Sequence, residues 1–273
     1  MLELHCHTTY SDGTLTPAAL VKAAVKAGVR ALAITDHDTL AGWDEAFVAA
    51  QEYELEVVPG VELSTVHGDR SMHILGFYPD RTQLSAPLHE RLEGRKHRAQ
   101  AMIQKLADLG YEVQLPELED GKAPGRPHVA AALLAAGYVQ STQEAFDRFL
   151  GDCKPAYVNY GSFSAVEGIA LLRSCGAVPV WAHPYLYRGR NVEDVIEELV
   201  DAGLMGVEAY HPSHTPSQRE RLIELAARYD LLISGGSDYH GPPSSPPRDY
   251  VNTLNMMALP LSLLEPIKQA AQT

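Results

Sequence analysis

Residues 1–13, MLELHCHTTYSDG, place a short apolar run directly before a cluster of imidazole and carboxylate groups. In an extended strand alternate residues share one face, so His5 and His7 point the same way. Burying both imidazoles at a strand end is costly unless each finds a ligand or a polar partner. We therefore interpret this stretch as a strand that carries a functional site at its carboxyl end.

The pattern of a short apolar run followed by a helix recurs along the chain. The first helix is predicted to have Thr16 as its N-cap and Pro17 in its first turn. The predicted strands cover residues 1–5, 29–35, 56–60, 72–78, 177–182, 206–210 and 231–234. Apolar rather than alternating strands are typical of a parallel sheet covered by helices. Seven such units favour a closed or nearly closed α/β barrel over an open sheet.

One stretch interrupts this alternation. Between residues 81 and 156 the pattern predicts no good strand and is helical over 88–109, 126–136 and 141–150. We therefore expect a mostly helical insertion subdomain at 81–156. The barrel would be formed by residues 1–80 and 157–273.

Composition restricts the partners of the chain. Its 273 residues, 45% of them hydrophobic, suffice for a large core. The formal charge of −13 argues against binding long duplex nucleic acid, but it permits a small phosphorylated substrate held by a few local cations. The longest apolar run, of 11 residues, is too short to cross a membrane. Three scattered cysteines and the absence of a signal-peptide pattern predict a cytoplasmic protein. The sequence does not specify its oligomeric state.

A His, Asp or Glu residue lies in or just after every predicted strand, and all but the strand at 206–210 supply a candidate metal ligand. The carboxyl ends of barrel strands meet on one face, where active sites are built. The nine candidates are His5, His7, Asp12, His37, Glu62, His73, His183, Asp238 and His240. Imidazole and carboxylate ligands without thiolates suit Mn, Zn, Fe or Mg, of which we expect Mn. Because one ion takes about three or four protein ligands, these candidates fit two or three divalent ions.

The residues beside these candidates have structural interpretations as well. Asp36 and Asp38 could cap a helix or orient the ring of His37, and we expect Asp36 to orient it. Cys6 lies on the face opposite to the flanking histidines, so we expect it in the core.

Six motifs occur in order: HCHTTYSDG from His5, TDH ending at His37, PGVE ending at Glu62, His73, AHP around His183, and SDYH ending at His240. Together they resemble the motifs of the polymerase and histidinol phosphatase (PHP) metallohydrolases. The resemblance implies a distorted seven-stranded β/α barrel that hydrolyses phosphate esters with two or three divalent metals. By position it implies three ligand sets: His5, His7, Glu62 and Asp238; Glu62, His73 and His183; and Asp12, His37 and His240.

Within that family the chain is most similar to nucleoside 3′,5′-bisphosphate phosphatases and short-RNA 5′-to-3′ exonucleases. The similarity rests on GRPH at 125–128, KPAYV at 154–158 and YHPSH at 210–214, although Asn159 replaces an expected proline. It implies that substrate phosphates are bound by Arg126, His128, Lys154 and His211. We expect Arg126 to act in catalysis too. His128 or His211 would protonate the leaving oxygen or pair with the second phosphate.

The resemblance therefore predicts a phosphatase that removes the 3′-phosphate of nucleoside 3′,5′-bisphosphates, such as adenosine 3′,5′-bisphosphate, by attack of a metal-bridging hydroxide. The alternatives are a 5′-to-3′ exoribonuclease acting on short RNA and a histidinol-phosphate-type phosphatase. Two further alternatives belong to other classes of protein: a non-catalytic metal-binding PHP module and an amidohydrolase-type barrel. The last usually relies on a metal-bridging lysine at a strand end, and no predicted strand ends in one.

Overall fold

The computed structural model describes residues 1–115, 124–159, 163–242 and 253–272. Its seven strands form one sheet in the order of the sequence. The strands are β1 (Leu2–Glu3), β2 (Ala31–Ile34), β3 (Glu56–His67), β4 (Arg70–Phe77), β5 (Val178–Trp181), β6 (Gly206–Tyr210) and β7 (Leu232–Gly235). All seven predicted strands are thus present.

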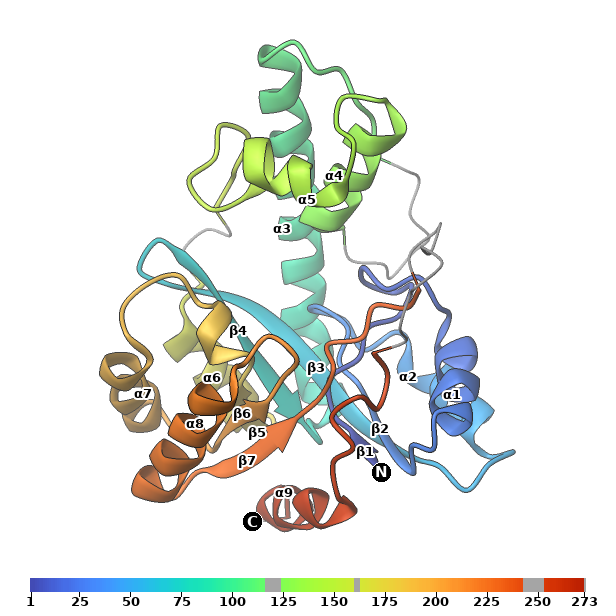
Figure 1. Ribbon diagram of the computed structural model, residues 1–273, viewed down its shortest axis with the longest axis vertical. Coiled ribbons are helices and arrows are strands. Elements are labelled where there is room, and N and C mark those ends of the chain that lie inside the picture. The colour runs from blue at the N-terminus through green and yellow to red at the C-terminus, as the bar shows by residue number, and fades with distance from the viewer. Residues whose placement is uncertain (116–123, 160–162, 243–252, 273) are drawn as a thin grey trace.

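The sheet curls until its two edges nearly meet (Figure 1). Beyond β1 and β7 the chain makes a parallel bridge between Cys6 and Tyr239. The backbone N–H of His7 donates to the carbonyl of Tyr239 at 2.8 Å, and that of Leu4 donates to Gly235 at 3.2 Å. These bonds bring the first and last strands together, so the prediction of a seven-stranded, nearly closed β/α barrel is confirmed.

One strand corrects the expectation of a wholly parallel sheet. Strand β4 runs antiparallel to both β3 and β5. Only Gly68 and Asp69 link β3 to β4, and a link so short allows a hairpin but no parallel crossover. Strand β3 also continues to His67 instead of ending at residue 60, so Glu62 lies inside a strand and not after one. His73 therefore reaches the site from within β4, opposite Ser64.

Helices cover the outside of the barrel and form a second layer above it (Figure 1). They are α1 (Pro17–Lys26), α2 (Trp43–Ala50), α3 (Arg81–Asp108), α4 (Arg126–Ala135), α5 (Thr142–Ala145), the π-helical turn η1 (Phe146–Leu150), α6 (Ala165–Ser174), the turn η2 (Pro184–Leu186), α7 (Val192–Asp201), α8 (Pro216–Tyr229), the turn η3 (Leu261–Leu263) and α9 (Leu264–Ala270). As predicted, Thr16 caps α1 by accepting from the N–H of Ala19. In the described part of the chain, no helix combines the length and apolarity that a membrane span requires.

Helix α3 belongs to both layers. It starts at Arg81, seven positions before the predicted start, with Asp80 as its N-cap. Leu84 and Leu88 pack in the core between the sheet and its covering helices. Further along, Met102 and other buried residues of α3 pack in a separate core with α4, α5 and η1. We call the part of α3 after residue 98, together with residues 124–158, the cap. At 28 residues, α3 is about 42 Å long, enough to connect both layers.

Candidate metal and phosphate site

The structure brings all nine predicted ligand side chains to one end of the barrel, around Glu62. Its oxygen Oε2 faces three imidazole nitrogens, those of His5 (3.3 Å), His7 (3.1 Å) and His37 (3.1 Å). The other oxygen, Oε1, lies 2.9 Å from His73 Nδ1 and 3.1 Å from His183 Nε2. The two oxygens of one carboxylate thus face two different sets of imidazoles.

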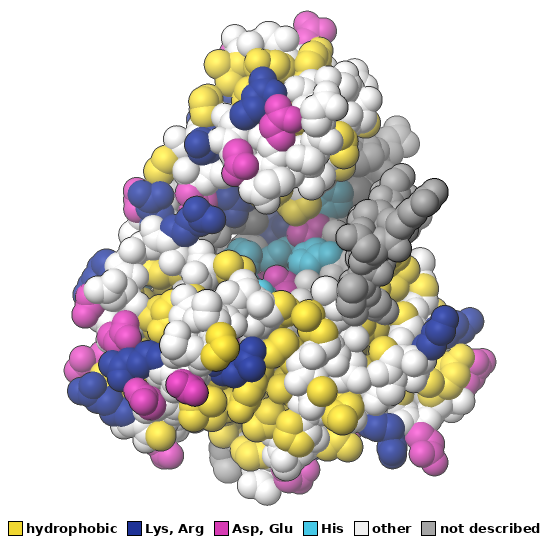
Figure 2. All heavy atoms as spheres, viewed as in Figure 1, with side chains coloured by type: hydrophobic (Ala, Val, Ile, Leu, Met, Phe, Trp, Pro, Cys, Tyr) yellow, Lys and Arg dark blue, Asp and Glu magenta, His cyan; other side chains and the backbone are white. Residues whose placement is uncertain are grey.

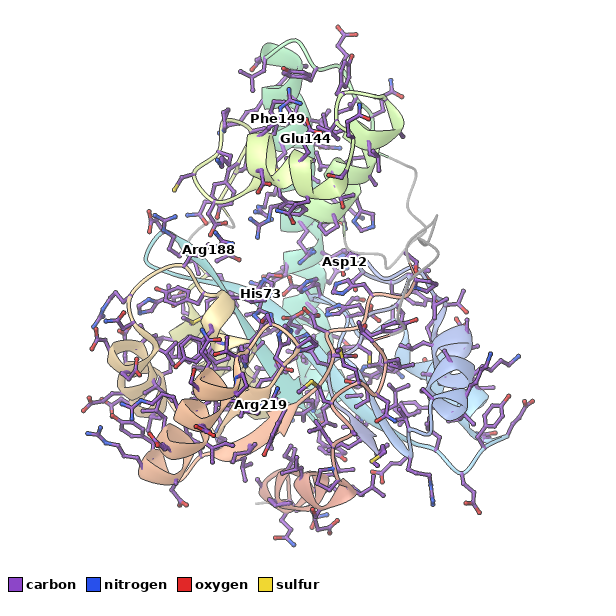
Figure 3. The ribbon with its side chains drawn as sticks, in the orientation of Figure 1. Asp12, His73, Glu144, Phe149, Arg188 and Arg219 are labelled. Atoms are coloured by element: carbon purple, nitrogen blue, oxygen red, sulfur yellow. The ribbon has the colours of Figure 1, made fainter. Side chains whose placement is uncertain are left out.

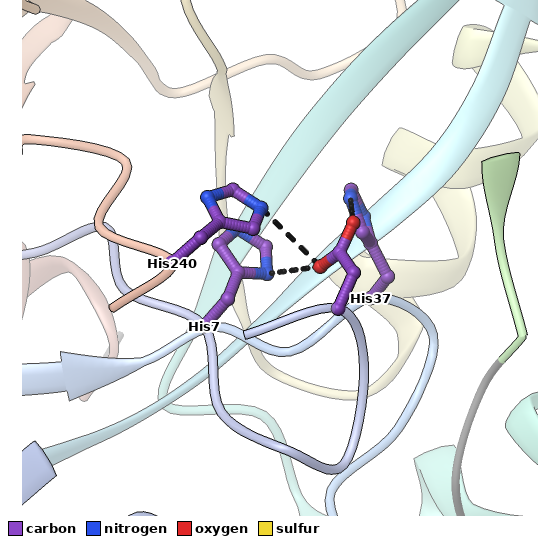
Figure 4. A group of neighbouring side chains, drawn as sticks. His7, His37 and His240 are labelled. Carbon is purple, nitrogen blue, oxygen red and sulfur yellow. Dashed lines mark ion pairs between the residues drawn. The ribbon is translucent and has the colours of Figure 1, made fainter. Parts of the chain in front are cut away.

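A second carboxylate, that of Asp12, faces His7, His37 and His240, the three histidines labelled in Figure 4. Its Oδ1 lies 3.3 Å from His240 Nε2 and 3.5 Å from His7 Nδ1, and its Oδ2 lies 3.7 Å from His37 Nε2. Asp238 completes the cluster, with Oδ1 3.2 Å from His7 Nε2 and 3.4 Å from His5 Nε2.

The geometry of these atoms suits divalent cations. Three groups have ligand atoms within 4.8 Å of one another: His5, His7, Glu62 and Asp238; His7, Asp12, His37 and His240; and His37, Glu62 and His73. Among the described residues, four of these atoms are buried without a hydrogen-bond partner: His5 Nε2, His7 Nε2, Asp12 Oδ1 and His37 Nδ1. Buried polar atoms are costly unless satisfied, and imidazole and carboxylate groups can be satisfied by a metal. The residues present therefore fit a metal centre.

Burial and the neighbouring charges set the protonation of the cluster. Burial raises the pKa of the Glu62 carboxyl. The surrounding histidines, chiefly His37 and His73, more than offset this effect and hold the pKa well below its usual range. Burial lowers the pKa of His37 to about 3, although the carboxylates of Glu62 and Asp12 oppose this change. Burial also opposes charge on His7, yet the carboxylates of Asp238 and Glu62 raise its pKa to about 10. The cluster thus combines the carboxylate of Glu62, which stays charged, with carboxylates that stabilise positive charge on a neighbouring group.

The backbone at three strand ends is strained. Asp38, His183 and Asp238 all adopt positive φ, of 52°, 31° and 52°. For residues other than glycine this conformation costs about 1–2 kcal/mol each. Such strain persists only where the surrounding structure enforces it, and it is concentrated at functional sites. Here it occurs at or beside the candidate ligands.

Sequence analysis missed two buried glutamates that support the cluster. His5 donates from Nδ1 to Glu208 at 3.0 Å, which directs its Nε2 toward Glu62. The other, Glu3, accepts from the N–H of Ser237 at 2.6 Å, next to Asp238, and burial raises the pKa of Glu3 to about 7. Both acids lie within otherwise apolar strands, where an unpaired carboxylate would be too costly. That signal could have identified them.

The predicted role of Asp36 was wrong. Its carboxylate does not orient the ring of His37 but accepts from Thr8 N–H at 2.7 Å and from the hydroxyls of Thr8 and Ser11 at 2.6 Å each. Asp36 therefore holds the loop that carries His7 and Asp12. Cys6 is fully buried in the core, as expected.

Asp38 connects the site to α3. Its carboxylate accepts from Arg91 Nε and from Arg95 Nη1, both at 2.8 Å, and from the N–H of Ser64 at 3.2 Å. Burial raises the pKa of the Asp38 carboxyl, but Arg91 and Arg95 lower it by more, so the group stays charged. The strand end that carries His37 is thus tied to the helix that reaches the cap.

A cleft of about 790 Å³ lies between the barrel and the cap. Figure 2 shows histidine side chains inside this hollow. Its floor includes six of the nine candidate ligands: His37, Glu62, His73, His183, Asp238 and His240. Arg126 and Lys154 line it from the cap, as does Asp152, which accepts from Arg126 Nη1 at 2.8 Å. Two cations that sequence analysis did not select, Arg70 and Arg188, line it from the barrel.

The two other predicted substrate-binding residues, His211 and His128, lie in different parts of the structure. His211 is buried beside the cluster, with Nε2 3.6 Å from Asp238 Oδ2, and its ring lies 5.5 Å from that of His183. His128 is in the first turn of α4, where its Nδ1 accepts from the N–H of Gly125 at 3.1 Å. His128 therefore caps the helix that begins at Arg126.

Comparison with known proteins agrees with this site. A 5′-3′ exoribonuclease of Haemophilus influenzae is 37% identical over 250 residues, covering 88% of this chain and 90% of the relative. A phosphoribosyl 1,2-cyclic phosphate 1,2-diphosphodiesterase of Eggerthella lenta is 34% identical (88% and 94% covered), and a 3′,5′-nucleoside bisphosphate phosphatase of Chromobacterium violaceum is 32% identical (88% and 87%). A Bifidobacterium adolescentis structure assigned as a metal-dependent phosphoesterase superposes with a TM-score of 0.79 at 34% identity, covering 96% and 97%.

The barrel and its ligand cluster, with these relatives, define a metal-dependent phosphoesterase, a hydrolase of phosphate esters. The model of the PHP domain matches residues 3–147. The chain belongs to the PHP domain family.

Proposed function

We propose that this enzyme removes the 3′-phosphate of nucleoside 3′,5′-bisphosphates. The observation that carries the proposal is that two cations of the cap, Arg126 and Lys154, line the same cleft as the ligand cluster. A substrate with one phosphate at the cluster and a second at these cations would span the cleft. The name of the Chromobacterium violaceum relative supports the same reaction.

We propose that the cluster holds two or three divalent ions, with manganese as the expected metal. The three ligand sets would be those that the resemblance implies: His5, His7, Glu62 and Asp238; Glu62, His73 and His183; and Asp12, His37 and His240. The first of them coincides with one of the groups formed by ligand atoms within 4.8 Å of one another. When bound, such ions neutralise phosphate charge and lower the pKa of water so that hydroxide is available near pH 7. The carboxylate of Glu62 would join the first two sets, since its two oxygens face different histidines.

The cap would supply the second phosphate site and close the pocket. Residues 81–156 would act as a unit in this role, around the helix that begins with Arg126. One nitrogen of the Arg126 guanidinium is held by Asp152, and Phe146 and Tyr157 lie 5.8 and 5.6 Å from its centre. These contacts orient a planar group whose other N–H donors match phosphate oxygens. Lys154 would add a second positive charge beside it.

We assign the two histidines of the site to different tasks. His211 lies beside Asp238 and His183, so it would act next to the reacting phosphate. His128 would support the phosphate site indirectly, because it caps the helix that carries Arg126.

Replacement of Arg126 by alanine tests the phosphate site. We expect Arg126→Ala to lower kcat/KM for adenosine 3′,5′-bisphosphate about 10- to 100-fold, mostly through KM, because it removes a charge-assisted contact. Hydrolysis of p-nitrophenyl phosphate, which has a single phosphate, should change much less. Arg148→Ala is the matched control, since Arg148 is also in the cap and also pairs with a carboxylate, that of Glu144 at 2.6 Å, but is not among the residues that line the cleft. An unchanged kcat/KM would remove Arg126 from the site.

A second candidate is 5′-to-3′ exoribonuclease activity on short RNA. The observation that favours it is the size of the cleft: at about 790 Å³ it lies in the upper part of the range of about 300–1,000 Å³ for pockets that hold drug-sized ligands, which leaves room for more than one nucleotide. The Haemophilus influenzae relative carries this activity in its name. A screen with Mn²⁺ would compare adenosine 3′,5′-bisphosphate, a 5′-phosphorylated oligoribonucleotide, phosphoribosyl 1,2-cyclic phosphate and histidinol phosphate. The highest kcat/KM identifies the preferred class.

A further inference from the structure

Arg188 lines the cleft from the barrel, whereas Arg126 and Lys154 line it from the cap. It follows the turn η2 after β5, and it lines the cleft together with Arg70, the first residue of β4. In Figure 3 Arg188 lies below the cap residues Glu144 and Phe149. The cleft is therefore lined by cations from the barrel as well as from the cap, together with residues of the ligand cluster.

The backbone that carries Arg188 is held in place. The hydroxyl of the preceding residue, Tyr187, is 2.7 Å from His67 Nδ1 at the end of β3. The Tyr187 ring packs 5.7 Å from that of His67 and 6.1 Å from that of Trp181. A Cβ at Gly189 would lie 1.9 Å from the Tyr187 hydroxyl, so only glycine fits there without displacing Tyr187. Arg188 is thus presented to the cleft from an anchored segment.

The charge of Arg188 is available to a ligand. In the part of the chain that the structure describes, no carboxylate forms an ion pair with Arg188. By contrast, Arg190 in the same segment pairs with Glu198 at 3.6 Å, and Arg70 lies 3.4 Å from Asp69. An exposed arginine facing a cleft in a chain of net charge −13 makes a local site for an anion.

We propose that Arg188 binds a phosphate of the substrate other than the reacting one and the one held by Arg126. This inference rests on the proposed function. In a nucleoside 3′,5′-bisphosphate the ligand cluster takes one phosphate and the cap cations take the other, which leaves Arg188 unused. A third phosphate is present only in a longer chain. Arg188 therefore extends the site to oligonucleotides, with the 5′-phosphate at the cap, the first diester at the cluster and the next diester at Arg188.

The test compares two substrates in the wild-type protein and two variants. The substrates are adenosine 3′,5′-bisphosphate and a 5′-phosphorylated trinucleotide, each with Mn²⁺. For Arg188→Ala we expect the ratio of kcat/KM for the trinucleotide to that for the bisphosphate to fall about 10-fold. Arg190→Ala is the control, because its cation is already paired, and it should leave the ratio as in the wild type.

A binding measurement gives a readout that does not need turnover. We expect Arg188→Ala to weaken binding of a fluorescent 5′-phosphorylated trinucleotide to the metal-free protein. The slope of log Kd against log salt should fall by about 0.7, the value for one phosphate contact on a single strand.

The outcomes separate the inference from the proposed function. If wild-type protein hydrolyses the bisphosphate but Arg188→Ala leaves the substrate ratio and the salt slope unchanged, the inference is wrong. An equal loss on both substrates would also overturn it, because Arg188 would then belong to a mononucleotide pocket. If the wild type hydrolyses neither substrate, the proposed function fails, and the binding measurement alone decides the role of Arg188.

Discussion

Glu62→Gln is expected to reduce phosphoesterase activity about 1,000-fold, the range lost when a group that stabilises charge in a reaction is removed. The two oxygens of Glu62 face five imidazoles between them. Glutamine keeps the shape but removes the negative charge, and its amide NH2 replaces one of the two carboxylate oxygens with a group that cannot bind a metal or accept from a protonated ring nitrogen. The variant should therefore lose metal as well as activity.

Metal content distinguishes this effect from unfolding. We expect Glu62→Gln to retain fewer equivalents of Mn²⁺ by elemental analysis after gel filtration, while its circular dichroism matches that of the wild type. Glu265→Gln, on α9 at the opposite end of the barrel, is the control and should change neither quantity. Full metal occupancy with normal turnover in Glu62→Gln would contradict a shared ligand at this position.

Arg95→Met is expected to lower the free energy of unfolding by about 3–5 kcal/mol, the typical cost of breaking a buried ion pair from one side. Arg95 is 4% exposed and donates from Nη1 to Asp38 and to Ser64 Oγ at 2.8 and 2.7 Å. Removing the guanidinium leaves the buried carboxylate of Asp38 with Arg91 as its remaining cation. Urea unfolding followed by circular dichroism measures the loss.

A second arginine of the same helix provides the comparison. Arg81 also forms a short ion pair, 2.7 Å from Asp44, but both side chains are largely exposed. Exposed pairs contribute about 0–1 kcal/mol, so Arg81→Met should change stability little. Equal losses in the two variants would show that burial of the Asp38 pair does not matter.

The barrel and the ligand cluster could be predicted because their signals are local. Each strand is a short apolar run, and the spacing of His5 and His7 by two residues places both rings on one face whatever the rest of the chain does. The strand ends then meet because the sheet closes. The direction of β4 was missed although Gly68, with φ of 62°, and Asp69 form a turn too short for a crossover. Pro59-Gly60 was taken as the end of β3, but the strand continues through it.

The supporting interactions could not be predicted in the same way, because their partners are distant in the sequence. Glu208 and His5 are 203 positions apart, and nothing near either residue specifies the other. The pairing of Asp38 with Arg95 depends on the direction that α3 takes after β4. Periodicity predicts that such a helix exists, but not which of its cations will be buried.

The continuity of α3 has a consequence for how the enzyme admits its substrate. Gly94 is a weak point of that helix, but Arg91 and Arg95 on either side of it are both fastened to Asp38. The usual place for a hinge is therefore held, and α3 cannot bend at Gly94 without breaking these bonds. The width of the entrance is set by the reach of the side chains around it rather than by an angle between two moving bodies. Evolution of a larger or smaller substrate range on this scaffold would then proceed by exchanging rim residues, one at a time, on a frame that stays rigid.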